Sequence, residues 1–372
     1  MSTERADAID AFLKSAGWGA AARAPLPGDA STRRYVRLKL NGKGAMLMDQ
    51  PQGAEAPTAP AHATPEERRA LGYNAIARLA GADCSRFVAT SNFLRANGLS
   101  APDIYASDVK QGLAIIEDLG DALYADVLDA GADERQLYET AAEVLAKLHA
   151  GNAPELLPPA TPLFAYDETA QLAEIDLITE WFIPVALGRT ATHAETEEHR
   201  HLWRSALAEA RKASPVFVHR DYHAQNLMWL KNRSGVARVG LIDFQDAVAG
   251  SKAYDLISLI EDARRDVSPE LGEATTRHYL DAMKKQGTPL DEESFRGQMA
   301  IMAAQRNAKI AGIFARLYKR DGKPRYLDYL PRVWGYLNKD LEHPSMAKLK
   351  TFYDRAIPRE KRGRPQVQGA AA

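Results

Sequence analysis

Residues 216–230 read VFVHRDYHAQNLMWL and residues 236–246 read VARVGLIDFQD, and these two neighbouring stretches decide the fold. Leu227 to Leu230 and Val236 to Ile242 are runs of strand-forming residues. A turn cluster that ends in glycine, Asn232 to Gly235, separates them. The pattern predicts a β-hairpin.

Polar side chains lie at the open end of this predicted hairpin. Pairing across the turn sets Asn226 opposite Leu241 and places Asp243 about one pair further on. The turn type leaves this register open by a residue or two. Asp221 lies on the loop that leads directly into the first strand. We therefore expect an amide oxygen and a carboxylate side by side, with a second carboxylate on the adjoining loop.

These oxygen atoms suggest a division of chemical roles. Asn226 and Asp243 offer ligands that suit Mg²⁺, which keeps several waters and bridges substrate phosphates. Asp221 can instead accept a proton from an attacking hydroxyl, with Asn226 completing the catalytic pair. The order His-Arg-Asp, four residues, Asn, then Asp-Phe after a hairpin matches that of protein kinases. The alternative, ordinary turn-forming polar residues, is disfavoured by the number of coincident positions.

Composition limits the class of protein. The chain has 372 residues, of which 45% are hydrophobic and 26% charged, which predicts a globular protein of two lobes. A formal net charge of -1 gives no electrostatic reason to expect nucleic acid or an anionic membrane as a partner. The single cysteine, Cys84, excludes an intramolecular disulfide. With a polar N-terminus and no long apolar run, we expect a cytoplasmic protein. The sequence does not reveal the oligomeric state, for which a monomer is the default expectation.

A turn of small and polar residues precedes the strand Tyr35 to Leu38. Its backbone amides and the hydroxyls of Ser31 and Thr32 can cradle a phosphate, and Arg33 or Arg34 can add charge. A plain hairpin turn with solvated arginines explains the same residues equally well. Both interpretations stay open at this point.

The sequence also suggests where two lobes join. The apolar run Ala114 to Ile116 leads into an acidic segment containing glycine, in which Glu117 and Leu119 offer backbone groups to an adenine edge. A simple loop is the alternative. We therefore expect the following organisation: an N-lobe at 1–116 with an exposed Pro-rich insertion at 50–65, a hinge at 117–121, a helical C-lobe at 122–358 and a disordered tail at 359–372.

Apolar residues at helical spacing predict helices at 7–16, 66–80, 85–97, 133–150, 168–187, 195–212, 253–264 and 298–318. Asp255 on one of these either accepts hydrogen bonds from the backbone or from His219, or lies exposed. Gln305, Arg306 and Lys309 occupy adjacent faces of the last helix. Together with His223 they are candidates for binding a polar or acidic substrate, although solvated charges are the commoner outcome.

The chain resembles the aminoglycoside phosphotransferase and choline kinase branch of the protein-kinase-like fold. More narrowly, it resembles the bacterial N-acetylmuramate/N-acetylglucosamine anomeric kinases of cell-wall recycling. The resemblance spans residues 11–341 and rests on these stretches: GDASTRRY at 28–35, LMDQP at 47–51, IEDLGD at 116–121, VHRDYHAQNL at 218–227, IDFQDA at 242–247 and QRNAK at 305–309.

The resemblance implies an α+β protein with a small β-rich N-lobe, a larger helical C-lobe and ATP between them. It implies Asp221 as the base, Asn226 and Asp243 on Mg²⁺, and a sugar 1-phosphate made from the anomeric hydroxyl in peptidoglycan recycling. Because in-line phosphoryl transfer is mostly positioning and charge neutralisation, these groups nearly suffice.

One departure from ordinary kinases concerns the ATP-binding lysine. Residues 45–49 read AMLMD, without the Val-Ala-x-Lys pattern. The resemblance to the anomeric sugar kinases extends to this Met-Asp pattern, so the absence of the lysine pattern favours that subgroup over a protein kinase. Arg33, Arg34 and Lys43 are the candidates for the cation that meets the phosphates.

Two other functions remain open. An aminoglycoside or amino-alcohol kinase needs an acidic pocket for its polycationic substrate, whereas Arg306 and Lys309 favour an acidic or neutral ligand such as N-acetylmuramate. A pseudokinase that only binds nucleotide would explain the missing lysine, but the intact Asp221, Asn226 and Asp243 argue against it. The preference between N-acetylmuramate and N-acetylglucosamine, and the nucleotide used, stay open.

Overall fold

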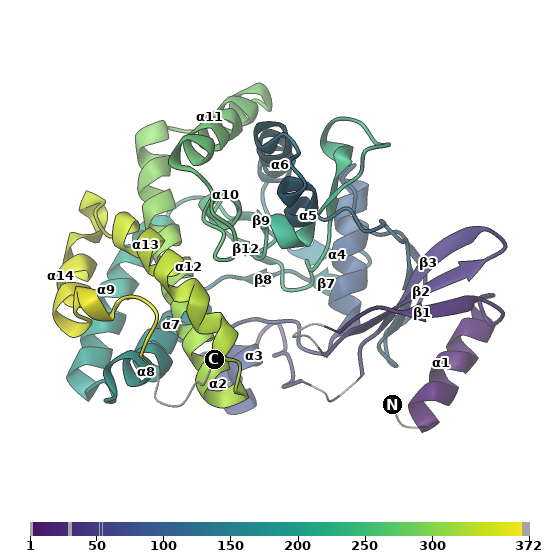
Figure 1. The fold of residues 1–372 in the computed structure, drawn as a ribbon, viewed down its shortest axis with the longest axis horizontal. Coiled ribbons are helices and arrows are strands. Elements are labelled where there is room, and N and C mark those ends of the chain that lie inside the picture. The colour runs from purple at the N-terminus through teal and green to yellow at the C-terminus, as the bar shows by residue number, and fades with distance from the viewer. Residues whose placement is uncertain (1–2, 29–31, 52, 54, 367–372) are drawn as a thin grey trace. The chain divides into compact units, whose positions relative to one another are not determined.

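The computed structural model describes residues 3–28, 32–51, 53 and 55–366 and is drawn in Figure 1. It divides into two compact units. Unit 1 comprises Met1–Ala132, Pro154–Phe164 and Gln225–Ala247, and unit 2 comprises Asp133–Ala153, Ala165–Ala224 and Val248–Ala372. The polar hairpin therefore belongs to unit 1, and the loop that carries Asp221 belongs to unit 2.

Unit 1 is built on a five-stranded antiparallel sheet of order β1-β2-β3-β5-β4. Its strands are β1 (Ala22–Pro25), β2 (Arg34–Leu40), β3 (Lys43–Asp49), β4 (Ile104–Asp108) and β5 (Leu113–Ile116). The turn between β2 and β3 has positive φ at both Asn41 (51°) and Gly42 (80°), which is the geometry a tight two-residue hairpin needs.

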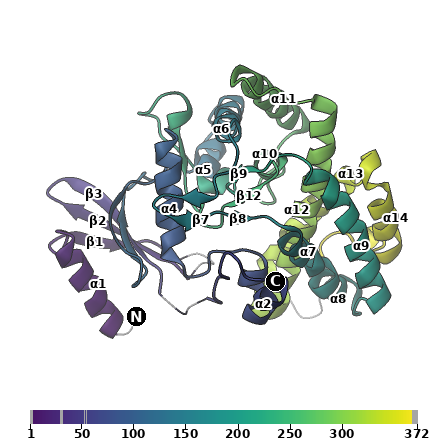
Figure 2. The same ribbon diagram turned by 180° about the vertical axis from the view of Figure 1, so that it is seen from behind.

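Helix α1 (Thr3–Ser15) covers one face of this sheet, as Figures 1 and 2 both show. Ile9, Phe12 and Leu13 of the helix are buried against residues of the sheet such as Leu38 and Leu47. Leu38 is the buried residue of β2 on the face that α1 covers.

The remaining elements of unit 1 are α2 (Pro65–Leu71), α3 (Tyr73–Ile76), α4 (Cys84–Ala96), α5 (Tyr124–Asp129), β6 (Leu156–Leu157), β7 (Thr161–Pro162), β10 (Leu227–Trp229) and β11 (Val239–Leu241). The single helix predicted at 66–80 is wrong. Gly72, with φ at 99°, separates α2 from α3, because a right-handed helix cannot continue through that conformation.

Strands β10 and β11 form the predicted hairpin, with a register one residue away from the expected one. Leu227 pairs with Leu241, and the Ile242 N–H donates to the Asn226 carbonyl at 3.2 Å. Asn226 thus lies opposite Ile242 rather than Leu241. The slip arises because Gly235–Arg238 forms a 3₁₀ turn where the sequence predicted the start of a strand.

Unit 2 is mainly helical. Its helices are α6 (Glu134–His149), α7 (Glu168–Leu177), α8 (Ile183–Leu187), α9 (His193–Ala210), α10 (Ala253–Ile260), α11 (Pro269–Lys285), α12 (Glu292–Asp321), α13 (Leu330–Asp340) and α14 (Ala347–Ala356). Two short strands, β9 (Val216–Val218) and β12 (Val248–Gly250), pair antiparallel. In β8 (Phe164–Ala165), the first residue is assigned to unit 1 and the second to unit 2.

The long helix α12 packs against several elements of unit 2, among them α7, α10 and α13. It approaches α7 very closely at one glycine. A Cβ atom on Gly312 would lie 2.4 Å from the Leu177 Cβ and 2.5 Å from the Leu177 carbonyl carbon. Only glycine permits this crossing, which brings the polar residues of α7 and α12 together.

Two sequence predictions for unit 2 need correction. The helix predicted at 168–187 contains a π-helical turn at Ile178–Phe182 between α7 and α8. The tail predicted to be disordered from Arg359 begins instead with a 3₁₀ turn at Arg359–Lys361, and the buried Arg362 guanidinium donates to Asp354 and Asn338, at 2.8 Å in each case. Residues 367–372 lie outside the described residues.

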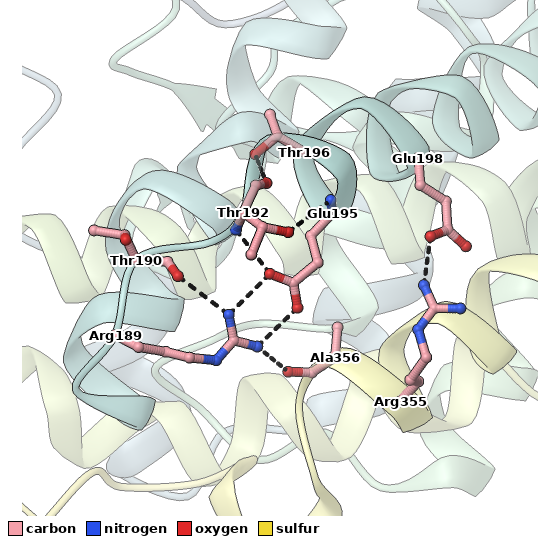
Figure 3. Close-up of polar contacts among 8 residues, drawn as sticks. All are labelled: Arg189, Thr190, Thr192, Glu195, Thr196, Glu198, Arg355 and Ala356. Atoms are coloured by element: carbon pink, nitrogen blue, oxygen red, sulfur yellow. Dashed lines mark hydrogen bonds and ion pairs between the residues drawn. The ribbon is translucent and has the colours of Figure 1, made fainter.

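The start of α9 is tied to the end of α14, as Figure 3 shows. Thr192 and Glu195 form a capping box, and Arg189 donates to both carboxylate oxygens of Glu195 at 2.8 Å. The same guanidinium also meets the Ala356 carbonyl at 3.4 Å. These contacts satisfy the first amides of α9 and fix the C-terminal helix beside it. Among the described residues, no helix combines the length and hydrophobicity that crossing a membrane requires.

Candidate active site

Asn226 and Asp243 meet at the open end of the hairpin in unit 1. The Asn226 Nδ2 lies 3.4 Å from the Asp243 Oδ2. Asp243 has φ at 61°, a left-handed conformation that is uncommon for a residue other than glycine. Such strain persists where the surroundings fix it, and it clusters at functional sites.

Helix α4 and the segment before it hold the chain that follows Asp243. The buried Phe244 ring stacks on Phe87 of α4 with centroids 4.9 Å apart. The Asp246 carboxylate accepts the Ala80 N–H at 2.6 Å, and the Ala247 carbonyl accepts from Arg86 at 3.3 Å. The Asp-Phe-Gln-Asp motif at residues 243–246 is therefore fixed by the packing of Phe244 and by hydrogen bonds to the two residues that follow Gln245.

Arg33 lies directly against this motif. Its Nη2 donates to the Asp243 Oδ1 and its Nη1 to the Gln245 Oε1, both at 2.6 Å. Burial opposes its charge, but Tyr35, Asp243 and Asp246 outweigh burial and raise the pKa of Arg33. The structure thus brings a predicted phosphate-binding cation to a predicted metal ligand.

The other predicted phosphate-binding residues are placed differently. Thr32 donates its hydroxyl to the Glu55 carboxylate at 2.6 Å. Arg34 is exposed at the start of β2, and Lys43 is exposed at the start of β3. Ser31 lies outside the described residues.

The oxygen atoms at this site fit a Mg²⁺ ion that arrives with a nucleotide. Asn226 and Asp243 supply an amide and a carboxylate oxygen, hard ligands of the kind that Mg²⁺ takes alongside waters and phosphates. Within the described part of the chain, no three His, Cys, Asp or Glu side chains gather to form a metal cage of their own. These two oxygen donors therefore suit a Mg²⁺ ion whose other ligands are phosphates and waters, rather than an ion held by protein side chains alone.

The predicted hinge segment is anchored to the sheet of unit 1. The Glu117 N–H donates to the Asp103 carbonyl at 2.8 Å, and the Leu119 side chain faces Gly240 of β11. Arg37 of β2 donates to Asp118 and to Asp121, at 2.7 Å in each case. The sequence did not indicate these two ion pairs, because they join residues more than 80 positions apart.

In unit 2, Asp255 of α10 holds the loop that leads to Asp221. Its two carboxylate oxygens accept the N–H groups of His219 at 2.6 Å and Arg220 at 2.9 Å. Burial raises the pKa of Asp255 to about 7, although the two amides act in the opposite direction. The prediction that Asp255 orients this loop is confirmed, and the exposed alternative is wrong because the side chain is fully buried.

The predicted substrate residues of α12 turn inward. Gln305 donates its amide to the Tyr166 hydroxyl at 2.9 Å and to Glu174 at 3.0 Å, and Lys309 lies 3.1 Å from Glu174. The prediction of solvated charges on this face is wrong, since all of these side chains are buried. Glu174 was missed, although a carboxylate in the apolar stripe of α7 is a signal that sequence analysis can use.

His223 and Arg306 lie near Asp221. The His223 N–H donates to the Asp221 carbonyl at 3.1 Å, and Arg306 donates to the Glu261 carbonyl at 3.0 Å. Burial, followed by the charges of Arg264 and Arg306, lowers the pKa of His223 against the opposing effect of Asp262 and Asp221. His223 is therefore neutral near pH 7.

Comparison with known proteins agrees with these features. The chain belongs to the phosphotransferase enzyme family, which matches residues 22–290. It is 44% identical to an N-acetylmuramate/N-acetylglucosamine kinase of Caulobacter vibrioides over 97% of this chain and 99% of that protein. It is 32% identical to a protein of the same name from Pseudomonas aeruginosa, over 90% of this chain and 89% of the other.

Solved structures share the fold at low sequence identity. Choline kinase LicA from Streptococcus pneumoniae superposes with a TM-score of 0.54 at 14% identity and covers 93% of this chain and 99% of its own. The aminoglycoside phosphotransferase APH(2'')-Ib, bound to ADP, gives a TM-score of 0.53 at 14% identity and covers 94% and 99%. The prediction of an α+β, protein-kinase-like fold is confirmed, and so is that of a phosphotransferase.

Proposed function

We propose that this protein is a kinase that uses ATP and Mg²⁺ to phosphorylate the anomeric hydroxyl of N-acetylmuramate or N-acetylglucosamine. The observation that carries the proposal is the 44% identity, over almost the whole of both chains, to a kinase named for these two sugars. The choline and aminoglycoside kinases share only the fold, at 14% identity. We further propose that the protein works as a monomer in the cytoplasm, in the recycling of cell-wall sugars.

Asp221 would act as the general base. It accepts the proton of the anomeric hydroxyl as that oxygen attacks the terminal phosphate of ATP. Asp255 supports this role by fixing the two amides immediately before Asp221. Because phosphoryl transfer depends mainly on alignment, a loop held at its backbone is well suited to carry the base.

Asn226 and Asp243 would hold Mg²⁺, which supplies charge neutralisation at the phosphates when it is bound. The left-handed backbone of Asp243 and the packing of Phe244 support this proposal, because both hold the carboxylate at the hairpin end.

Arg33 is our choice for the cation that replaces the missing strand lysine. Its guanidinium lies 2.6 Å from a carboxylate that we assign to the metal, and a planar guanidinium suits bidentate contact with phosphate. Arg34 and Lys43, the other candidates, are exposed.

For the sugar, we propose contacts from His223 and Arg306. Asp221 and Arg306 both act electrostatically on His223, which supports a common neighbourhood for these three residues. Gln305 and Lys309 direct their polar atoms to Glu174, so we assign them an indirect part in catalysis.

A substrate panel tests the proposal. Purified protein is mixed with ATP and one acceptor at a time: N-acetylmuramate, N-acetylglucosamine, kanamycin or choline. We expect ADP release only with the amino sugars, only with Mg²⁺ present, and not with Asp221→Asn. Turnover with kanamycin or choline alone would favour the amine kinases, and ATP binding without turnover on any acceptor would favour a pseudokinase.

A further inference from the structure

Glu174 is the centre of a buried polar network in unit 2 that links α7, α12 and the loop before Asp221. One carboxylate oxygen accepts from Arg220 and lies 3.1 Å from the Lys309 ammonium. The other accepts the Tyr166 hydroxyl and, at 3.0 Å, the Gln305 amide. The Arg220 and Glu174 side chains are fully shielded from solvent. The carboxylate thus receives four side-chain contacts from three parts of the chain.

Two cations, Arg220 and Lys309, contact the Glu174 carboxylate. Burial opposes the ionisation of Glu174, but Lys309 and Arg220 outweigh it and lower the pKa of Glu174 to about 2. Asp221 also acts electrostatically on Lys309. Since buried charges are balanced by opposite ones, the Asp221 carboxylate contributes to the charge balance around Lys309.

Arg220 occupies a strained position immediately before Asp221. Its φ of 81° lies in the left-handed region, where residues with a side chain rarely remain unless other contacts hold them. Asp255 holds its N–H at 2.9 Å, and Glu174 holds its guanidinium. The backbone direction at Asp221 therefore depends on two carboxylates: Asp255 holds the main chain of Arg220, and Glu174 holds its side chain.

We propose that Glu174 is a positioning residue for Asp221, because it fixes the strained Arg220 on one side and Lys309 on the other. The inference rests on the proposed function in that it assigns the reaction's base to Asp221. Glu174 does not touch the reacting atoms. It acts through Arg220 on the direction of the loop, and through Lys309 on the charge that faces the base.

Helix α7 provides a matched control for this role. Asp176, two residues after Glu174, is also a buried carboxylate paired with an arginine, since the Arg200 Nη2 lies 2.9 Å from its Oδ2. Its partner, Arg200, lies on α9 and contacts Asp176 and Glu197, neither of which is hydrogen-bonded to Glu174. Asp176→Asn therefore removes a comparable charge and ion pair from the same helix without touching the proposed positioning network.

The first test compares the kinetics of Glu174→Gln and Asp176→Asn on the acceptor that the wild-type protein phosphorylates best. We expect Glu174→Gln to lower kcat by about 30-fold or more with KM for ATP within about two-fold, because misalignment of the base affects the chemical step. Asp176→Asn should keep kcat within about three-fold, whatever its thermal stability. Equal losses of kcat in the two variants would overturn the inference.

A double-mutant cycle tests whether Glu174 acts through Arg220. If it does, Glu174→Gln combined with Arg220→Met should lower kcat by clearly less than the product of the two single effects, with the remaining loss due to the contact of Glu174 with Lys309. Asp176→Asn combined with Arg220→Met should instead lower kcat by the product of the two single effects. Multiplied effects of Glu174→Gln and Arg220→Met would overturn the proposed route.

Tyr166→Phe provides a milder test should the charge variants fail to fold. It removes one hydrogen bond to Glu174 and keeps all of the charges. We expect kcat to fall by about three- to ten-fold with KM for ATP unchanged, and an unaltered kcat would overturn the inference. A wild-type protein that phosphorylates an acceptor other than an amino sugar would contradict the proposed substrate but would leave this comparison intact.

Discussion

Arg33 donates to Asp243 at 2.6 Å, so the cation proposed for the phosphates and the carboxylate proposed for the metal neutralise each other. Gln245 joins them by accepting from Arg33 at 2.6 Å and donating to Asp243 at 3.1 Å. A metal ion at Asp243 would share one carboxylate with this guanidinium, because Arg33 donates to Oδ1 while Oδ2 lies 3.4 Å from the Asn226 amide. Binding of Mg²⁺ and the contact of Arg33 with phosphate are therefore expected to be coupled.

Arg33→Gln should weaken the use of ATP more than any change at the exposed arginine beside it. Loss of the guanidinium removes a charge-assisted contact worth about 1.5–3 kcal/mol, so we expect KM for ATP to rise by at least ten-fold. Arg34→Gln, the control, should change KM for ATP by less than about two-fold. Steady-state kinetics at saturating Mg²⁺ measure both, and equal effects of the two variants would contradict the role of Arg33.

Asp243→Asn should raise the Mg²⁺ concentration at which activity is half-maximal. An amide is a weaker ligand than a carboxylate for a hard divalent cation, so we expect a shift of at least ten-fold together with a lower kcat. The exposed Asp126 of α5 provides the control variant, Asp126→Asn. A Mg²⁺ titration of ADP release measures the shift, and an unchanged curve for Asp243→Asn would contradict its assignment as a metal ligand.

Asp255→Asn should lower both stability and kcat. The amide has one acceptor oxygen for two backbone N–H donors, and the unsatisfied donor costs about 1–3 kcal/mol. Because the pKa of Asp255 rises from 3.8 to about 7 on folding, the native state keeps a proton that the unfolded chain loses in this pH range. The wild-type free energy of unfolding should therefore fall between pH 4 and pH 7, and the variant should show a smaller fall. Urea unfolding across that range measures both proteins. The same dependence of the free energy of unfolding on pH in the wild type and in Asp255→Asn would contradict this account.

Asp340→Asn should stabilise the protein at alkaline pH. Burial raises the pKa of both Asp340 and Glu261, and Asn307 donates to the two carboxyl groups at 2.9 Å and 2.7 Å. Stability that depends on protonated carboxyls is present at low pH and is lost as pH rises through the folded-state values. An amide replaces the protonated form at every pH, so we expect a gain of about 1 kcal/mol at pH 8 that shrinks towards pH 4. A variant less stable than the wild type at pH 8 would contradict this interpretation.

The sequence predicted the local part of the site well. Asn226 and Asp243 flank a short hairpin, so their proximity follows from two strand-like runs and a glycine turn. The register slipped by one residue because Gly235–Arg238 forms a 3₁₀ turn, which apolar periodicity does not reveal. Likewise, the spacing of apolar residues predicted one helix at 66–80, which Gly72, with its positive φ, divides into two.

Long-range partners could not be predicted in this way. The contacts of Arg33 with Asp243 and of Arg220 with Glu174 join segments 210 and 46 residues apart. The residues next to each of these side chains in the sequence do not indicate its partner, because the packing of whole helices and strands determines which side chains meet. Helices α11 and α13 were also missed, although α13 has the spacing of an amphipathic helix in its buried residues Leu330, Val333, Trp334 and Leu337.

The central claim, that Asp221 takes the proton of a sugar hydroxyl during transfer of phosphate, is tested most directly by identifying the product. ³¹P NMR of a reaction containing ATP, Mg²⁺ and N-acetylmuramate or N-acetylglucosamine should show a phosphate resonance coupled to the anomeric proton. Asp221→Asn should give no such resonance while it still binds ATP. Phosphate on any other position of the sugar, or the same product at an undiminished rate from Asp221→Asn, would contradict the account.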